Sequence, residues 1–202
     1  PWGMLPARAN TPGFFHTWGA HSPHALVVAG MALDRQDWID SAAASANSFL
    51  LRQLAFERFR HTGVIPSRLE QIAYGTNSLV QTYAALYRAT GEERYAQYAG
   101  LAASWYFGNN MANTQVYFPE NGRVYDGING PVSWRVNRNS GAESTIEGLM
   151  SLSAIADIPE AVELLQVESV DGSSWQILEA ESGDRVLGTP VYFPTMWTGE
   201  GY

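Results

Sequence analysis

The segments Trp18-Gly-Ala-His-Ser-Pro23, Ala73-Tyr-Gly-Thr-Asn-Ser78 and Asn137-Arg-Asn-Ser-Gly-Ala-Glu-Ser144 share one pattern. Each is a run of small and polar residues that leads into an apolar helical stretch, a tight turn and a second, amphipathic stretch. Helical hairpins repeated in this way stack side by side and share a core. The starts of their inner helices can then meet at one pocket, so the sequence predicts a mainly α fold with a site at that end.

The helical period and the turn residues set the expected elements. Pro23 fits a first helical turn with Ser22 as its cap, and Gly91 fits the end of a helix. Between the second and third hairpins, the turn Glu120-Asn121-Gly122 predicts a β-hairpin inside a long loop over residues 109–138. Loops of this length are more often functional than accidental. The predicted helices span residues 23–33, 36–59, 69–89, 92–107, 142–156 and 159–165, and the predicted hairpin strands span 115–118 and 123–125.

The pattern changes to that of β-strands from residue 166 onward. We therefore expect a helical domain over residues 1–165 and a short β module over residues 166–202. The chain opens at Pro1 without an initiator Met and closes at Tyr202 in mid-pattern, so we expect a piece of a longer protein.

Composition narrows the classes of function. The net charge of −8 and the lack of a basic stripe argue against nucleic acid as a partner. The chain has no cysteine, which excludes disulfides and thiolate metal sites. No run of about 18 apolar residues predicts a membrane span. Aromatic residues make up 12% of the chain, and such richness suits a sugar site, although core packing is the commoner role for any one of them.

Glu143 is the candidate catalytic acid, because it lies near the start of the third predicted inner helix. The alternative is that it caps the helix and complements its dipole. That helix is apolar on nearly every side, at Ile146, Leu149, Met150, Leu152 and Ile155. We therefore expect it to be buried, with its start opening onto a cavity. Partial burial suits a carboxyl group to proton donation.

A second carboxylate is needed for glycosidic chemistry, and Asp126 is the candidate. Its Asp-Gly context is also a turn signature, which is the simpler interpretation. Glu147, one turn beyond Glu143, is either a further carboxylate on the same face or an arginine partner. Glycosidases place two carboxyl groups about 5 to 10 Å apart.

Other polar and aromatic residues of the approach segments are candidate substrate ligands. His21 fits a pocket rim; with His24 it can also form a metal pair, but no third ligand has convincing spacing. Tyr74 and Trp134 offer faces for sugar rings, and Trp18 is a weaker candidate, whereas Trp105 falls in a packed stripe and is expected in the core. Arg135 suits a uronate carboxylate or a local acid. The predicted substrate-binding set is His21, Tyr74, Asn77, Trp134, Arg135 and Asn139.

The hairpins resemble the six-hairpin (α/α)6-toroid glycosidases. Leu86-Tyr-Arg-Ala-Thr-Gly-Glu-Glu-Arg-Tyr95 looks like their inter-helix turn. The order of Trp105-Tyr-Phe-Gly-Asn-Asn110, a variable loop and Asn139-Ser-Gly-Ala-Glu143 is similar to the closing part of glycoside hydrolase family nine. The resemblance covers three hairpins of six and implies that Glu143 is the general acid.

The tail resembles a second kind of protein. Ile177-Leu-Glu-Ala-Glu181 and Trp197-Thr-Gly-Glu-Gly-Tyr202 look like the opening of carbohydrate-binding modules of families six and thirty-five. This resemblance implies a β-sandwich in which Glu179 and Glu181 help to hold a structural calcium ion. No other cofactor is expected.

The expected function is hydrolysis of glycosidic bonds by a secreted or periplasmic protein acting on a polysaccharide or oligosaccharide. One alternative keeps the fold and changes the reaction to that of a polysaccharide lyase or uronate epimerase, with Tyr74, His21 and Arg135 in the site. The other is a non-catalytic glycan-binding or interaction protein. The partner is a carbohydrate, with neither nucleic acid nor membrane, and an exposed half-toroid surface favours self-association.

Overall fold

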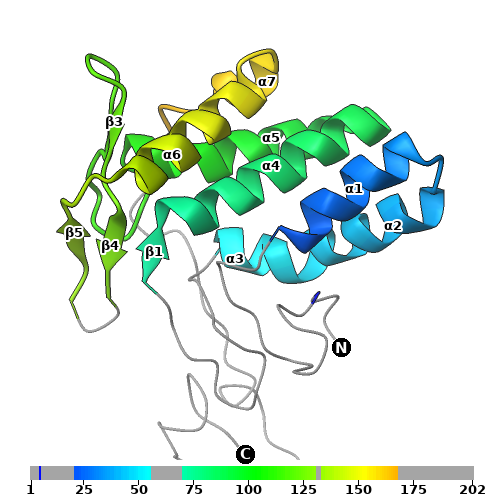
Figure 1. Ribbon diagram of the computed structural model, residues 1–202, viewed down its shortest axis with the longest axis horizontal. Coiled ribbons are helices and arrows are strands. Elements are labelled where there is room, and N and C mark those ends of the chain that lie inside the picture. The colour runs from blue at the N-terminus through cyan, green and yellow to red at the C-terminus, as the bar shows by residue number, and fades with distance from the viewer. Residues whose placement is uncertain (1–4, 6–20, 56–69, 131–132, 168–202) are drawn as a thin grey trace, which may run out of the picture.

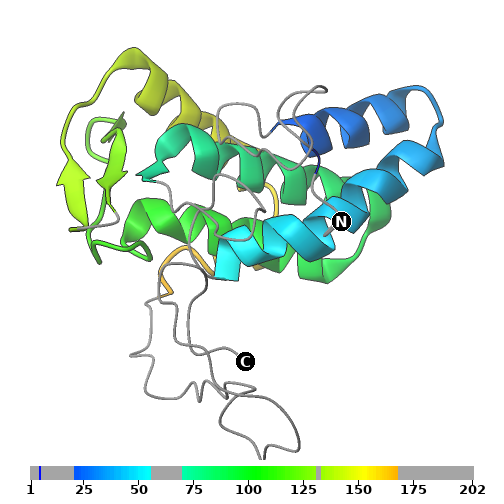
Figure 2. The ribbon, with the colours of Figure 1, turned by 90° about the horizontal axis from the view of Figure 1, so that it is seen from below.

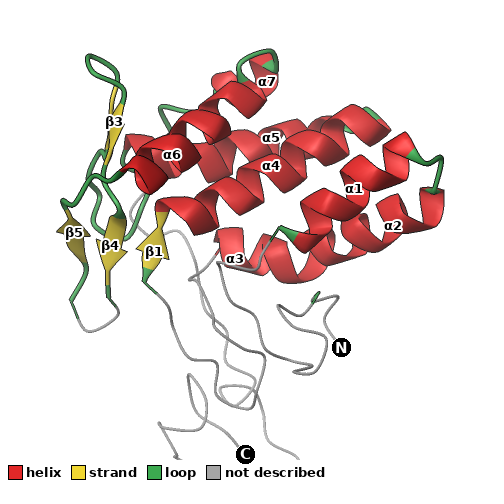
Figure 3. Ribbon diagram, viewed as in Figure 1, coloured by secondary structure: helices red, strands yellow, loops and turns green. Residues whose placement is uncertain are grey.

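The computed structural model describes residues 5, 21–55, 70–130 and 133–167. This part of the chain is mainly helical and carries two small antiparallel sheets (Figure 3). Of the β module expected over residues 166–202, residues 168–202, with the predicted calcium ligands Glu179 and Glu181, lie outside the described residues, as does Trp18.

Three helical hairpins follow one another along the chain (Figure 1). The first pairs α1 (Ser22–Ala32) with α2 (Gln36–Ser45), which continues through the π-helical segment η2 (Ala46–Leu50) into α3 (Leu51–Ala55). The second pairs α4 (Ala73–Thr90) with α5 (Glu93–Ala103), which continues through the 3₁₀ segment η3 (Ser104–Phe107). The third joins α6 (Ala142–Ile155) to the short α7 (Pro159–Val162).

The first helices of the hairpins form one layer, in which α1, α4 and α6 lie side by side and run in the same direction (Figures 1 and 2). The returning helices α2, α5 and α7 form the second layer. Helix α4 is central, since it packs against α1, α5 and α6, and 12 of its 18 residues are buried. The parallel course of α1, α4 and α6 brings their N-terminal ends to the same side.

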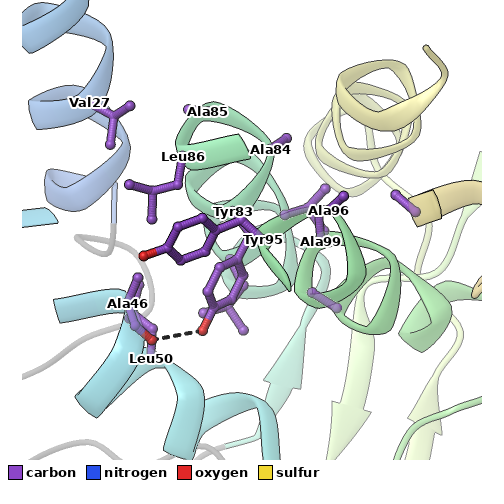
Figure 4. Packing of buried hydrophobic residues seen from close by; sticks show 14 of the residues in the cluster. Val27, Ala46, Leu50, Tyr83, Ala84, Ala85, Leu86, Tyr95, Ala96 and Ala99 are labelled. Atoms are coloured by element: carbon purple, nitrogen blue, oxygen red, sulfur yellow. Dashed lines mark hydrogen bonds between the residues drawn. The ribbon is translucent and has the colours of Figure 1, made fainter. Parts of the chain in front are cut away.

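Two buried tyrosines lie among alanine and other aliphatic side chains in the interior between the layers (Figure 4). Tyr83 of α4 and Tyr95 of α5 are stacked with their ring centroids 6.5 Å apart, and both are fully buried. The hydroxyl of Tyr83 donates to the carbonyl of Ala46 in the π-helical segment (3.1 Å), and Asn47 donates to the hydroxyl of Tyr95 (2.9 Å). Each buried phenol therefore has a polar partner in the first hairpin, which ties that hairpin to the second.

Helix ends agree with the sequence prediction at one position and differ at another. Gly91 ends α4 in the left-handed region at φ 70°, as expected of a C-cap glycine. Ser22 is not the cap of α1: it is the first helical residue, and His21 holds the cap position without a side-chain hydrogen bond. The prediction of a serine cap is therefore wrong by one residue.

A three-stranded antiparallel sheet at the N-terminal end of α4 was absent from the sequence prediction. Its order is β1 (Gln71–Ile72), β4 (Gly127–Asn129) and β5 (Arg135–Asn137). The helix predicted from residue 69 begins only at Ala73, because Gln71 and Ile72 pair with Ile128 and Gly127. Gly127 permits this close approach, since a Cβ there would stand 2.1 Å from the carbonyl oxygen of Gln71.

The predicted hairpin in the long loop is confirmed in a shorter form. Strands β2 (Tyr117–Phe118) and β3 (Arg123–Val124) pair antiparallel across the expected turn. Helix α5 together with η3 matches the helix predicted over residues 92–107 to within one residue. Helix α7 ends at Val162, whereas the sequence predicted a helix to residue 165.

The expected burial of α6 on all sides is wrong. Ile146, Leu149 and Met150 are 53%, 43% and 48% exposed. The buried face consists instead of Ser144, Gly148, Ser151 and Ile155. Small residues at this helical spacing let α6 approach its neighbours closely: a Cβ at Gly148 would stand 2.5 Å from a methyl group of Val124 in β3.

Candidate functional site

The N-terminal ends of the three parallel helices bring together side chains from all three hairpins. His21 precedes α1, Tyr74 is the second residue of α4, and Glu143 is the second residue of α6. The rings of His21 and Tyr74 are in edge-on contact, with centroids 5.4 Å apart. The ring of His24 lies 6.1 Å from that of His21. This end of the layer is the candidate site. It holds five of the predicted site residues, which are His21, Tyr74, Asn77, Asp126 and Glu143.

A buried polar network connects α4 to α6 beneath these residues. The side-chain amide of Asn77 donates to the carboxylate of Glu147 (2.5 Å). The carbonyl oxygen of the same amide accepts from the hydroxyl of Ser151 (2.9 Å), which lies 3.0 Å from the hydroxyl of Tyr106. Asn77, Ser151 and Tyr106 are at most 1% exposed, so their geometry is fixed by packing as well as by hydrogen bonds.

Asp126 is held at the junction of the site by three hydrogen bonds. Its carbonyl oxygen accepts from the backbone N–H of Ala73, the first residue of α4 (2.9 Å). Its own N–H donates to the carbonyl of Asn139 (2.8 Å), and its carboxylate accepts from the hydroxyl of Ser144 on α6. One residue thus satisfies a free donor at the start of α4 and fixes the start of α6.

The same packing perturbs the ionisation of the aromatic residues. Burial raises the pKa of Tyr74, and the negative charges of Glu147 and Glu143 raise it further. Burial lowers the pKa of His21, and the carboxylate of Glu147 opposes part of that shift. Burial, followed by the charge of His21, lowers the pKa of His24. At neutral pH the site therefore offers a protonated phenol beside a neutral imidazole, one a proton donor and the other a proton acceptor.

Glu143 itself is exposed, so the expectation that it is partly buried is wrong. Within the described part of the chain, its carboxylate has neither a hydrogen bond nor an ion pair. The carboxylate of Glu143 is therefore available to bind a ligand. Ser144, the residue after Glu143 in the chain, binds Asp126, so the start of α6 lies next to Asp126.

The remaining predicted residues occupy the rim formed by the three-stranded sheet. Trp134 is half-buried, and its ring lies where a Cβ of Gly130 would stand, so part of the ring serves packing. Arg135 is exposed in β5 and donates to the hydroxyl of Ser133 (3.0 Å). The side chain of Asn139 is exposed as well. Trp105 is 3% exposed and donates to Gln71 (3.0 Å), which confirms its core role.

Ser144 and Ser151 are site residues that sequence reasoning missed, and Glu147 was left with two interpretations. The signal that points to them is the stripe of small and polar residues at positions 144, 148 and 151. This stripe lies on a different face of the helix from the exposed apolar residues. Among the described residues, no group of three His, Asp or Glu side chains is arranged to hold an ion, and the predicted calcium ligands Glu179 and Glu181 lie outside them.

Comparison of the chain with protein-family models and with curated proteins found no match. The candidate site therefore rests on its geometry alone. Of the helices that the structure describes, none combines the length and apolar character that a membrane span requires.

Proposed function

We propose that this chain is a carbohydrate-active protein that hydrolyses glycosidic bonds at the N-terminal end of α1, α4 and α6. In this proposal the three hairpins are part of an (α/α)6 toroid, whose inner helices are the parallel helices of the first layer. Glu143 protonates the leaving oxygen, and Asp126 is the second carboxylate, which activates water.

The observation that carries this proposal is the convergence of Glu143, Asp126, Tyr74 and His21 from separate hairpins and the intervening loop on one end of the layer. Two carboxylates in one site provide an acid and a base. An aromatic ring and an imidazole beside them offer stacking and hydrogen bonding to a sugar. Glu143 is exposed and Tyr74 half-buried, so a sugar chain can reach them.

The contact of His21 with Tyr74 favours a second candidate, β-elimination at a uronate. In that reaction a base removes the proton at C5 and an acid protonates the departing O4, so the C4–O4 bond breaks and a C4=C5 double bond forms. A neutral His21 is the base and a protonated Tyr74 the acid. The raised pKa of Tyr74 and the lowered pKa of His21 keep the phenol protonated and the imidazole neutral at neutral pH, which are the starting states that these roles require.

The test is a panel of neutral and uronate-containing polysaccharides incubated with the protein at its natural length, with two readouts on each sample. New reducing ends without ultraviolet absorbance support hydrolysis. New reducing ends with the absorbance of an unsaturated uronate support elimination. Binding of a polysaccharide without either signal contradicts both reactions and favours a glycan-binding protein.

A further inference from the structure

We propose that Arg123 binds the carboxylate groups of an acidic polysaccharide. Arg123, Phe118 and Tyr125 together form a small surface on the hairpin of β2 and β3, which we call the Arg123 surface. That the ligand is a carbohydrate rests on the proposed function. That Arg123 binds a carboxylate does not, because binding is measured without any cleavage.

The Arg123 surface is the face of the hairpin opposite to the one that packs against α6. Phe118 pairs with Arg123 across the two strands, and Tyr125 lies two residues beyond Arg123, so the three side chains share one face. The other face carries Val124, which is fully buried and lies against Gly148 of α6. The turn of this hairpin projects from the body of the molecule (Figure 1), so a long ligand can reach it.

Two aromatic rings hold the guanidinium group of Arg123. Its central carbon lies 4.9 Å from the centre of the Phe118 ring and 5.0 Å from the centre of the Tyr125 ring. The two rings are in edge-on contact, with centroids 4.8 Å apart, and the guanidinium donates to the hydroxyl of Tyr125 (3.4 Å). These contacts restrict the side chain of Arg123, so less conformational freedom is lost when a ligand binds.

The charge of Arg123 is not neutralised by a neighbouring acid, in contrast to two similar arginines. Arg35 and Arg94 also lie over aromatic rings. Each of them is paired with an acid of its own segment, Arg35 with Asp37 and Arg94 with Glu92, both at 2.6 Å. Arg123 forms no ion pair with any of the described residues and is exposed. Most of its N–H donors therefore stay open to a ligand.

A carboxylate fits this surface because of the shape of the guanidinium group. Its parallel N–H donors match the two oxygens of a carboxylate. In a uronate the carboxyl group is attached to the sugar ring, so the ring lies beside Phe118 and Tyr125 when the carboxylate binds Arg123. Both aromatic side chains are half-buried and keep part of their apolar surface open. Nucleic acid is disfavoured by the net charge of −8.

The experiment is an NMR titration of the whole protein with a short oligogalacturonate. The signal of the Nε–H group of Arg123 is followed and is assigned by its loss in Arg123→Gln. We expect this signal to move with a saturable dependence on concentration, and to move far less with a neutral galactose oligomer. Oligoglutamate tests an acidic peptide, and inorganic phosphate tests a simple anion. No movement with oligogalacturonate, or equal movement with oligoglutamate or phosphate, overturns the proposal.

Three variants show whether the loss of binding is specific to Arg123. Arg123→Gln is expected to weaken the binding of polygalacturonate in affinity electrophoresis by about 5-fold, the scale of one exposed ion pair. Arg123→Lys should weaken it as well, because lysine lacks the planar donors. Arg94→Gln is the matched control, since Arg94 also lies over an aromatic ring but is already paired with Glu92. An equal loss of binding in Arg94→Gln contradicts the proposal.

Binding and cleavage are measured separately, so that failure of this proposal is distinguished from failure of the proposed function. If the protein binds oligogalacturonate through Arg123 and cleaves no polysaccharide, carboxylate binding stands and the proposed hydrolysis fails. If the protein cleaves polysaccharides and Arg123→Gln binds polygalacturonate as tightly as the wild type, the proposed function stands and the role of Arg123 is refuted.

Discussion

The hydroxyl of Ser144 on α6 donates to the carboxylate of Asp126 in the loop before β4, although 18 residues separate them in the chain. Through its backbone, Asp126 also binds the first residue of α4 and the approach to α6. This arrangement makes Asp126 a structural junction as well as a candidate catalytic group. The structural role can be tested at Ser144, because a substitution there leaves the carboxylate of Asp126 in place.

Ser144→Ala removes the donor to Asp126 and leaves the carboxylate in place. Because Ser144 is buried, we expect the free energy of unfolding to fall by about 1–2 kcal/mol in urea denaturation. Ser153→Ala, an exposed position on the same helix, is the control and is expected to change stability by less than about 0.5 kcal/mol. Equal stability of the two variants would show that the hydrogen bond contributes nothing.

Gly100→Ala tests the contact of α5 with α7. A Cβ at Gly100 would stand 2.4 Å from the backbone carbonyl oxygen of Ala161, so one helix must move. We expect a loss of about 1–3 kcal/mol in the free energy of unfolding, measured by chemical denaturation. Gln97→Ala on the exposed face of α5 is the matched control. Wild-type stability of Gly100→Ala would contradict the close packing of these helices.

Stability should decrease on acidification through the two half-buried histidines. The pKa values of His21 and His24 are lowered from the ordinary value of 6.5, in both cases mainly by burial. The unfolded chain therefore binds more protons than the folded chain as the pH falls below about 6.5, and each proton bound favours unfolding. The stability that neutral histidines provide is present above that pH and is lost between it and the lower folded pKa values.

The measurement is the melting temperature from about pH 7 to about pH 5, a range in which histidine titrates. Wild-type protein is compared with a variant that carries His21→Gln and His24→Gln. The double variant is expected to lose less melting temperature over this range than the wild type. If the two curves run parallel, the histidines do not contribute to the pH dependence.

The exposed apolar side of α6 predicts self-association. Ile146, Leu149 and Met150 present neighbouring apolar surface. We expect the mass measured by size-exclusion chromatography with light scattering to rise with protein concentration. Leu149→Glu should reduce that rise, whereas Ala44→Glu on the exposed side of α2 should not. A constant monomer mass for the wild type would contradict this prediction.

The sequence predicts the local features of this fold well. Helix periods, the C-cap at Gly91 and the hairpin turn near Asn121 depend on residues close together in the chain. The three-stranded sheet depends on the pairing of Gln71 with Ile128, which no local pattern encodes. The helix predicted from residue 69 therefore starts too early.

The burial of α6 could not be read from hydrophobicity alone. Its apolar residues Ile146, Leu149 and Met150 are exposed. Its buried face consists mainly of Ser144, Gly148 and Ser151, whose small size permits close contact. The same limitation affects the site. The contact of His21 with Tyr74 joins two of the residues that the sequence suggested. The hydrogen bond from Asn77 to Glu147 joins residues 70 positions apart and depends on the packing of α4 against α6.

The most direct test of the proposed chemistry is the rate of reducing-end release by Glu143→Gln on a polysaccharide that the wild type cleaves. We expect the rate to fall by about 100-fold or more, because a general acid is lost. The melting temperature should stay near that of the wild type, since Glu143 is exposed and has no partner among the described residues. Glu163→Gln, also exposed, should keep the wild-type rate. Retention of the wild-type rate by Glu143→Gln would contradict the assignment of Glu143 as the catalytic acid.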